Sequence, residues 1–241
     1  TGSWLSLVWP FSIALVLEKS KSFFQKITSI SFLIAIGFAT FITFSRNAWL
    51  GTLISIPLVL GQASFNWFLP ILFFSSLFVT VAISQINTID LDFRSQSSIS
   101  EKFLFQITKV AATGRFDIFL RALDMSFINP IFGIGGGSFP VVHELIFNSW
   151  KAHPHNLILE LALSYGYPVT IIFISTVTLI LFKSSIIIFK ENSGAISQFV
   201  FERAWWASIF IFLISQIFDV QYFDGRISII FWVLLAGLKK K

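Results

Sequence analysis

The chain has 241 residues, of which 55% are hydrophobic and only 12% are charged, and its formal net charge is +5. A soluble domain carries roughly 25% charged residues, so this chain lacks the polar side chains needed to cover a water-facing globule. Its 31 Phe and 8 Trp residues and its mean hydropathy of +0.82 agree. The composition predicts an integral membrane protein with no nucleic-acid partner. The absence of Cys excludes disulfides, thiol catalysis and cysteine metal sites.

Seven apolar segments follow one another along the chain, at residues 4–17, 27–44, 48–60, 67–86, 156–182, 205–218 and 227–238. They are apolar on every side rather than alternating, which favours helices over barrel strands. Four of them are shorter than the ~20 residues that cross a bilayer. We therefore predict an all-α transmembrane bundle of about seven spans, forming a single membrane domain over residues 1–241. Because the chain starts with Thr1 inside an apolar stretch, we expect that further N-terminal helices precede it.

The distribution of Lys and Arg predicts the orientation of these spans. If the segments alternate, one face receives nine basic residues in short connections: Lys19, Lys21, Lys26, Lys183, Lys190, Arg203, Lys239, Lys240 and Lys241. The short connections on the opposite face hold two, Arg46 and Arg226. The positive-inside rule makes the first face cytoplasmic and places the long loop at residues 87–155 outside.

The outer loop contains a predicted amphipathic helix at residues 115–128 and a glycine-rich turn at residues 133–137. Such a helix is suited to lie flat on the membrane interface. Its apolar face consists of Phe116, Leu120, Leu123 and Phe127, and its polar face of Asp117, Arg121 and Asp124.

The residues with the clearest chemical potential lie where the loop meets the membrane. His155 and Asn156 stand at the mouth of the fifth segment, and Glu160 follows one turn later. A histidine accepts protons near neutral pH, and an ionisable residue inside an apolar helix suggests a function. The alternative is an Asn helix cap, an interfacial His and a Glu bonded to another helix. A metal site at His153 and His155 is not expected, because the sequence shows no second cluster of ligands.

Arginines cluster on the same predicted face. Arg46 lies between two apolar segments, Arg115 opens the loop helix, and Arg226 follows Asp219 and Asp224 near the last segment. Taken singly, each is an ordinary interfacial or solvated charge. Two or three guanidiniums beside a histidine, however, form a suitable receiver for phosphate.

Four short motifs resemble the C-terminal core of the O-antigen ligase and polymerase superfamily. Residues 43–46 (Thr-Phe-Ser-Arg) are similar to its Ser-Arg signature, and Gly114 with Arg115 opens the long loop. Residues 129–135 resemble its Pro-x-x-Gly-x-Gly turn, and His155–Asn156 followed after nine residues by Gly166 resembles the ligase His-Asn motif. Val169 stands where the ligase motif closes with a small or hydroxylated residue, which leaves both ligase and polymerase open.

The resemblance implies a metal-independent, cofactor-free glycosyltransferase of the bacterial inner membrane with a periplasmic active face. A glycan would pass from polyprenyl pyrophosphate to the lipid A core, as in a ligase, or to another lipid-linked glycan, as in a polymerase. Arg46 and Arg115 would hold the pyrophosphate, and His155 would act as base or position the acceptor hydroxyl. Arg226, Asn156 and Glu160 would support substrate binding.

Two other classes remain open. A putative bicarbonate transporter group belongs to the same superfamily, and Gly-interrupted spans occur in transporters. A transporter should place its ionisable residues near the bilayer midplane, whereas only Glu160 lies deep here. The third possibility is an assembly subunit without a site of its own.

Overall fold

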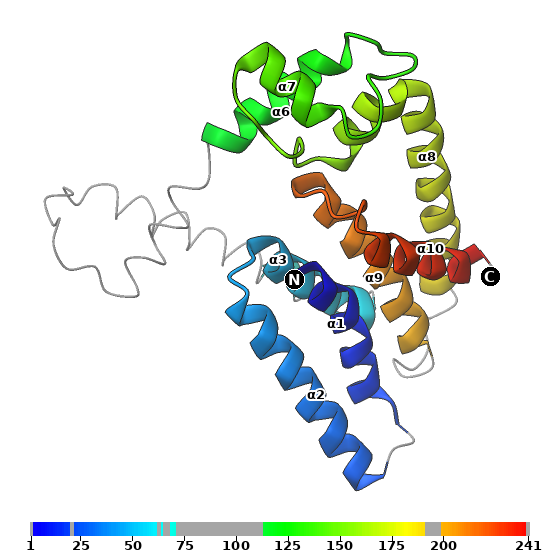
Figure 1. The fold of residues 1–241 in the computed structure, drawn as a ribbon. Helices are drawn as coiled ribbons and strands as arrows, with labels where there is room; N and C mark the ends of the chain where they lie inside the picture. The colour runs from blue at the N-terminus through cyan, green and yellow to red at the C-terminus, as the bar shows by residue number, and fades with distance from the viewer. Residues whose placement is uncertain are drawn as a thin grey trace, which may run out of the picture.

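The computed structural model describes residues 2–19, 22–61, 64, 68–70, 113–190 and 199–239. Within these ranges the secondary structure is helical and contains no strand. The helices are α1 (Gly2–Leu17), α2 (Phe23–Ile42), α3 (Arg46–Leu60), α6 (Thr113–Ser126), α7 (Phe139–Phe147), α8 (Leu157–Lys190), α9 (Val200–Phe218) and α10 (Gly225–Lys239) (Figure 1). The predicted all-α class is confirmed.

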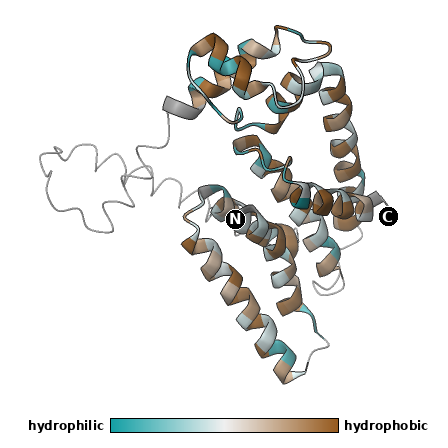
Figure 2. Ribbon diagram, in the orientation of Figure 1, coloured by the Kyte–Doolittle hydropathy of each residue, from teal (hydrophilic) through white to brown (hydrophobic). Residues whose placement is uncertain are grey.

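Six of the seven predicted apolar segments correspond to α1, α2, α3, α8, α9 and α10. The seventh, residues 67–86, lies outside the described residues apart from 68–70. Three helices, α2, α8 and α9, are long and apolar enough to cross a membrane, and α1, α3 and α10 are shorter apolar helices. Figure 2 shows apolar residues along α2 and α8, whose outward side chains include the 80% exposed Phe24. The count of seven spans is thus not confirmed.

Helix α9 occupies the centre of the helix bundle. It packs against α1, α3, α8 and α10, and Figure 1 shows it between the α1–α3 group and α8. Its Ser208 hydroxyl donates to the Leu7 carbonyl of α1 (2.8 Å), and its Trp206 indole donates to the Leu181 carbonyl of α8 (3.0 Å). Gly51 of α3 permits close approach, since a Cβ there would lie 2.7 Å from Ile211. The position of α9 is therefore fixed by several neighbours.

Helix α6 packs on α8, and together with α7 it covers one end of the structure (Figure 1). The face of α6 that packs inside the protein is distinct from the apolar face that the sequence predicts for the membrane interface. The side chains that pack against Phe139 of α7 and against Leu159 and Leu163 of α8 are Ile118, Ala122 and Met125. Of the predicted apolar face, Leu123 is partly buried, while Phe116, Leu120 and Phe127 are exposed. That α6 lies on the membrane interface through these exposed side chains stays a prediction.

Helix α8 is broken at Gly166, where φ is 83° and ψ is 167°. The loop at residues 129–135 fills the break: the Ile134 amide donates to the Leu163 carbonyl (2.6 Å) and the Tyr167 amide donates to the Pro130 carbonyl (2.8 Å). A Cβ at Gly166 would lie 2.0 Å from the Ile131 carbonyl oxygen. Two motifs separated in the sequence therefore form one joint, which ties the α6–α7 unit to the start of α8.

Candidate functional site

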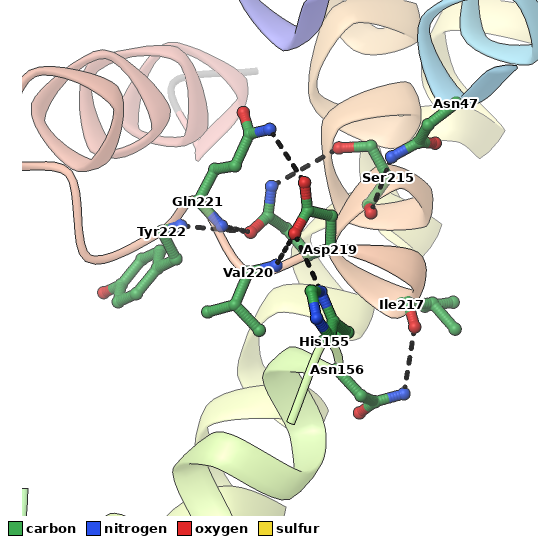
Figure 3. Close-up of polar contacts among 10 residues, drawn as sticks. Asn47, His155, Asn156, Ser215, Ile217, Asp219, Val220, Gln221 and Tyr222 are labelled. Carbon is green, nitrogen blue, oxygen red and sulfur yellow. Dashed lines mark hydrogen bonds and ion pairs between the residues drawn. The ribbon is translucent and has the colours of Figure 1, made fainter. Parts of the chain in front are cut away.

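Three segments meet at the C-terminal end of α9: the start of α3, the residues just before α8, and the loop that follows α9 (Figure 3). The last carbonyls of a helix lack partners within the helix. Two asparagines donate to carbonyls here. Asn47 Nδ2 donates to the Ser215 carbonyl (3.0 Å), which also accepts from the Asp219 amide (3.1 Å), and Asn156 Nδ2 donates to the Ile217 carbonyl (3.1 Å). Asn156 also caps α8, because its Oδ1 accepts from the Leu159 amide (3.1 Å). These contacts bring the neighbours Arg46 and His155, far apart in the sequence, to the same helix end.

His155 faces Asp219, the residue that ends α9. Their Nδ1 and Oδ1 atoms are 3.4 Å apart, and the two side chains are 28% and 35% exposed. Asp219 Oδ1 also accepts from the Val220 amide (3.1 Å), and Oδ2 accepts from Gln221 Nε2 (3.3 Å). The carboxylate that faces the imidazole is therefore held by its own loop (Figure 3), and the His155 side chain stays partly exposed.

Buried Gln216 holds the loop between α9 and α10. Its Oε1 accepts from the backbone amides of Gln221 (2.8 Å) and Tyr222 (3.0 Å), and its side chain is 1% exposed. The Tyr222 hydroxyl accepts from Trp232 Nε1 of α10 (3.1 Å). Burial raises the pKa of Tyr222 above its ordinary value. Gln216 thus fixes the backbone of the loop that begins at Asp219.

Two motif residues have left-handed backbone conformations that residues other than glycine seldom adopt. His155 has a φ of 55°, and Phe44, just before Ser45 and Arg46, has a φ of 50°. Ser45 then caps α3, its hydroxyl accepting from the Ala48 amide (3.3 Å). Strained backbone of this kind costs about 1–3 kcal/mol and concentrates at functional sites. The strained backbone conformation thus occurs in both segments that bond to the end of α9, the one before α3 and the one before α8.

The three predicted arginines share a position within their helices. Arg46 is the first residue of α3, Arg115 the third of α6 and Arg226 the second of α10, and the first turns of these helices hold no acidic residue. A cation there opposes the helix dipole, whereas an anion is favoured. The structure does not describe the side chains of Arg46 and Arg115. The Arg226 side chain is exposed, and among the described residues no carboxylate pairs with it.

Glu160 lies below Asn156 but does not contact His155 among the described side chains. It is 7% exposed, and its Oε1 is 3.5 Å from the Ser164 hydroxyl one turn further along α8. The carboxylate that the structure places beside His155 is Asp219. A substrate-binding role for Glu160 therefore stays a prediction.

An apolar groove of about 400 Å³ runs between α8 and α9. It starts at Leu157 and Ile217, the neighbours of the Asn156 contact, and continues past Val177 to Trp206 and Ser185. Its lining is almost wholly apolar.

A sequence profile of the O-antigen ligase family matches residues 30–174, more than half of the chain. The chain belongs to this family. The match covers α2 from Ile30 onward, α3, the α6–α7 unit and α8 up to Ile174, and so includes both strained motifs and the joint at Gly166. Curated proteins and solved structures gave no match. Membership supports a membrane enzyme of the ligase or polymerase type, as the sequence motifs predicted.

Sequence reasoning missed some residues of this site. Asp219 was noted as a polar neighbour but not as the partner of His155, because 64 residues separate them. Asn47 and Gln216 were not singled out. The sequence did contain a signal for Gln216. It is an uncharged polar residue in an apolar helix, and a buried polar side chain needs a hydrogen-bond partner. For Asn47 the only signal was its position directly after the Ser-Arg motif.

Proposed function

We propose that this protein transfers a glycan from polyprenyl pyrophosphate to an acceptor hydroxyl, with the lipid A core as the acceptor. The reaction would take place on the periplasmic face of the bacterial inner membrane. The observation that carries the proposal is the His155–Asp219 pair at the end of α9, next to the start of α3 where Arg46 lies. Family membership supplies the reaction class.

In the proposed mechanism His155 takes the proton of the acceptor hydroxyl. Asp219 accepts from the Nδ1–H of His155, which leaves Nε2 as the basic nitrogen facing the substrate. The acceptor oxygen bonds to the anomeric carbon of the sugar while the bond from that carbon to the pyrophosphate oxygen breaks. The electron pair leaves with the pyrophosphate, and the proton on His155 is released afterwards.

Charge develops on the departing pyrophosphate, and cations already in place lower the barrier to that step. Arg46 and Arg115 are proposed to supply these cations, with the N-terminal amides of α3 beside Arg46. Arg226 is a further candidate at the edge of the site. The polyprenyl chain of the donor would lie in the α8–α9 groove, which begins beside Asn156. No metal or cofactor takes part in this mechanism.

One observation favours a transporter as the second candidate: α8 is broken near a buried carboxylate, Glu160. In transporters the backbone groups freed by such breaks bind ions. Here Ile134 and Pro130 bond the freed groups instead, so the break has a structural explanation. Solute uptake that depended on Glu160 would reverse the order of the two candidates.

The surface-glycan ladder of cells carrying full-length protein tests the substrate assignment. His155→Ala should remove long chains from the lipid A core while long lipid-linked chains accumulate. A core capped by a single repeat would instead identify a polymerase. An unchanged ladder together with an unchanged lipid-linked pool would contradict both forms of the proposal.

A further inference from the structure

Three potential metal ligands lie together at the edge of the site: His153, His155 and Asp219. One ligand atom from each residue lies within 4.8 Å of the other two, and all three residues are partly buried. The two imidazole rings meet edge to face, with their centroids 4.3 Å apart. The His-Pro-His segment brings both rings to one side because His155 adopts a left-handed φ of 55°. The sequence showed only two of these ligands as neighbours.

The separation within the cluster suits a shared ion. His155 Nδ1 and Asp219 Oδ1 are 3.4 Å apart, which is long for an N–H···O hydrogen bond, typically about 2.9–3.0 Å. Two ligand atoms about 2.0–2.1 Å from a tetrahedral ion are separated by roughly 3.4 Å. The same two atoms are therefore already at the spacing that an ion between them requires.

The donor set selects the type of metal. Two imidazole nitrogens and one carboxylate oxygen suit Zn²⁺, which binds nitrogen and oxygen ligands tetrahedrally. Mg²⁺ prefers an octahedral shell of oxygens and would not hold two histidines. With three protein ligands, the fourth position of the ion would be open to water.

We propose that His153, His155 and Asp219 bind one Zn²⁺ ion, and that the bound ion inhibits glycan transfer. The inhibitory part rests on the proposed function. Zinc on Nδ1 of a neutral His155 leaves the ring proton on Nε2, and that nitrogen then has no lone pair for the acceptor proton. Zinc and the acceptor therefore compete for the same imidazole, and the metal acts as a reversible block.

Calorimetric titration of Zn²⁺ into purified full-length protein without a histidine tag tests the binding. The wild type should bind one equivalent and should not bind Mg²⁺. His153→Asn should weaken zinc binding about tenfold or more, since even the loss of a supporting contact costs 10–100-fold. Asp117→Asn on the exposed surface of α6 is the matched control and should leave binding unchanged. A wild type without a zinc equivalent, or equal binding by His153→Asn, would overturn the site.

Transfer assays on the same samples test the inhibition. Wild-type transfer should proceed in chelator and stop when zinc is added, whereas His153→Asn should transfer in both conditions. Zinc that binds without slowing the wild type would overturn the inhibitory role. If the wild type fails to transfer even in chelator, the proposed function is contradicted, and the calorimetric result still decides the zinc site.

Discussion

His155 depends on residues from several elements for its position. Asp219 faces its ring, Gln221 and the Val220 amide hold Asp219, and Gln216 holds the loop that carries them. Asn156, the next residue along the chain, is bonded to the end of α9. At the residue scale the site is therefore a partly exposed imidazole that faces a supported carboxylate and contacts the ring of His153.

Asp219→Asn should lower the kcat of transfer about 100-fold and leave KM little changed. The amide keeps the size of the carboxylate but no longer selects the His155 tautomer with a basic Nε2, and contributions of this kind are worth about 10²–10⁴. Asp224→Asn, in the same loop but exposed and bonded to the Arg226 amide, is the matched control. Steady-state kinetics measure both variants. A loss confined to KM, or an equal loss in both variants, would contradict the positioning role.

At the element scale the main feature is the joint between the broken α8 and the loop at residues 129–135. The break exists because Gly166 adopts a backbone conformation open almost only to glycine, and Pro168 has no amide to restore the helix. The backbone of the loop at residues 129–135 occupies the space that a side chain at position 166 would need. The joint sets how α6, which carries Arg115, lies relative to His155.

Gly166→Ala should destabilise the protein by at least about 2 kcal/mol, because backbone strain and overpacking each cost about 1–3 kcal/mol. Gly137→Ala separates the two causes: its φ is 72°, but nothing lies within 4 Å of an added Cβ. That control should lose only about 1 kcal/mol, the cost of the left-handed conformation. Thermal unfolding of full-length protein in detergent measures both. Equal losses of stability in the two variants would show that close packing of the loop against Gly166 does not contribute to the cost.

At the scale of the whole molecule, α9 is the helix around which the others pack. The starts of α3 and α8 meet its C-terminal end, and the capping box of Ser22 and Gln25 starts α2 (3.0 and 3.4 Å) in the connection that follows α1. If the helices alternate as the charge distribution predicts, the connection after α1 and the loop after α9 lie on opposite faces of the membrane.

Single cysteines test this topology, since the chain has none of its own. Asp224→Cys and Lys19→Cys replace exposed charged residues in the α9–α10 and α1–α2 connections. In a cysteine-free full-length protein, a membrane-impermeant maleimide should label Asp224→Cys in intact spheroplasts and Lys19→Cys only after the membrane is opened. Labelling of both from outside, or the reverse pattern, would contradict the proposed orientation.

The sequence predicted the all-α class and the family, because hydropathy and short motif spacing are local properties. Ser45 and Asn156, for example, begin helices as their residue types favour. It did not identify Ile118, Ala122 and Met125 as a second apolar face of α6, because only tertiary packing distinguishes that face from the exposed one. Nor did it pair His155 with Asp219 or Asn47 with Ser215, because such contacts depend on how α9 meets α3 and α8.

The central claim is that His155 performs or directs proton removal from the acceptor. The most direct test is glycan transfer by purified full-length protein from a polyprenyl-pyrophosphate donor, comparing His155→Ala with His153→Asn in chelator. We predict that His155→Ala loses about 100-fold or more in kcat, within the range for general base catalysis, while His153→Asn stays close to wild type. Wild-type transfer by a folded His155→Ala protein would contradict the account.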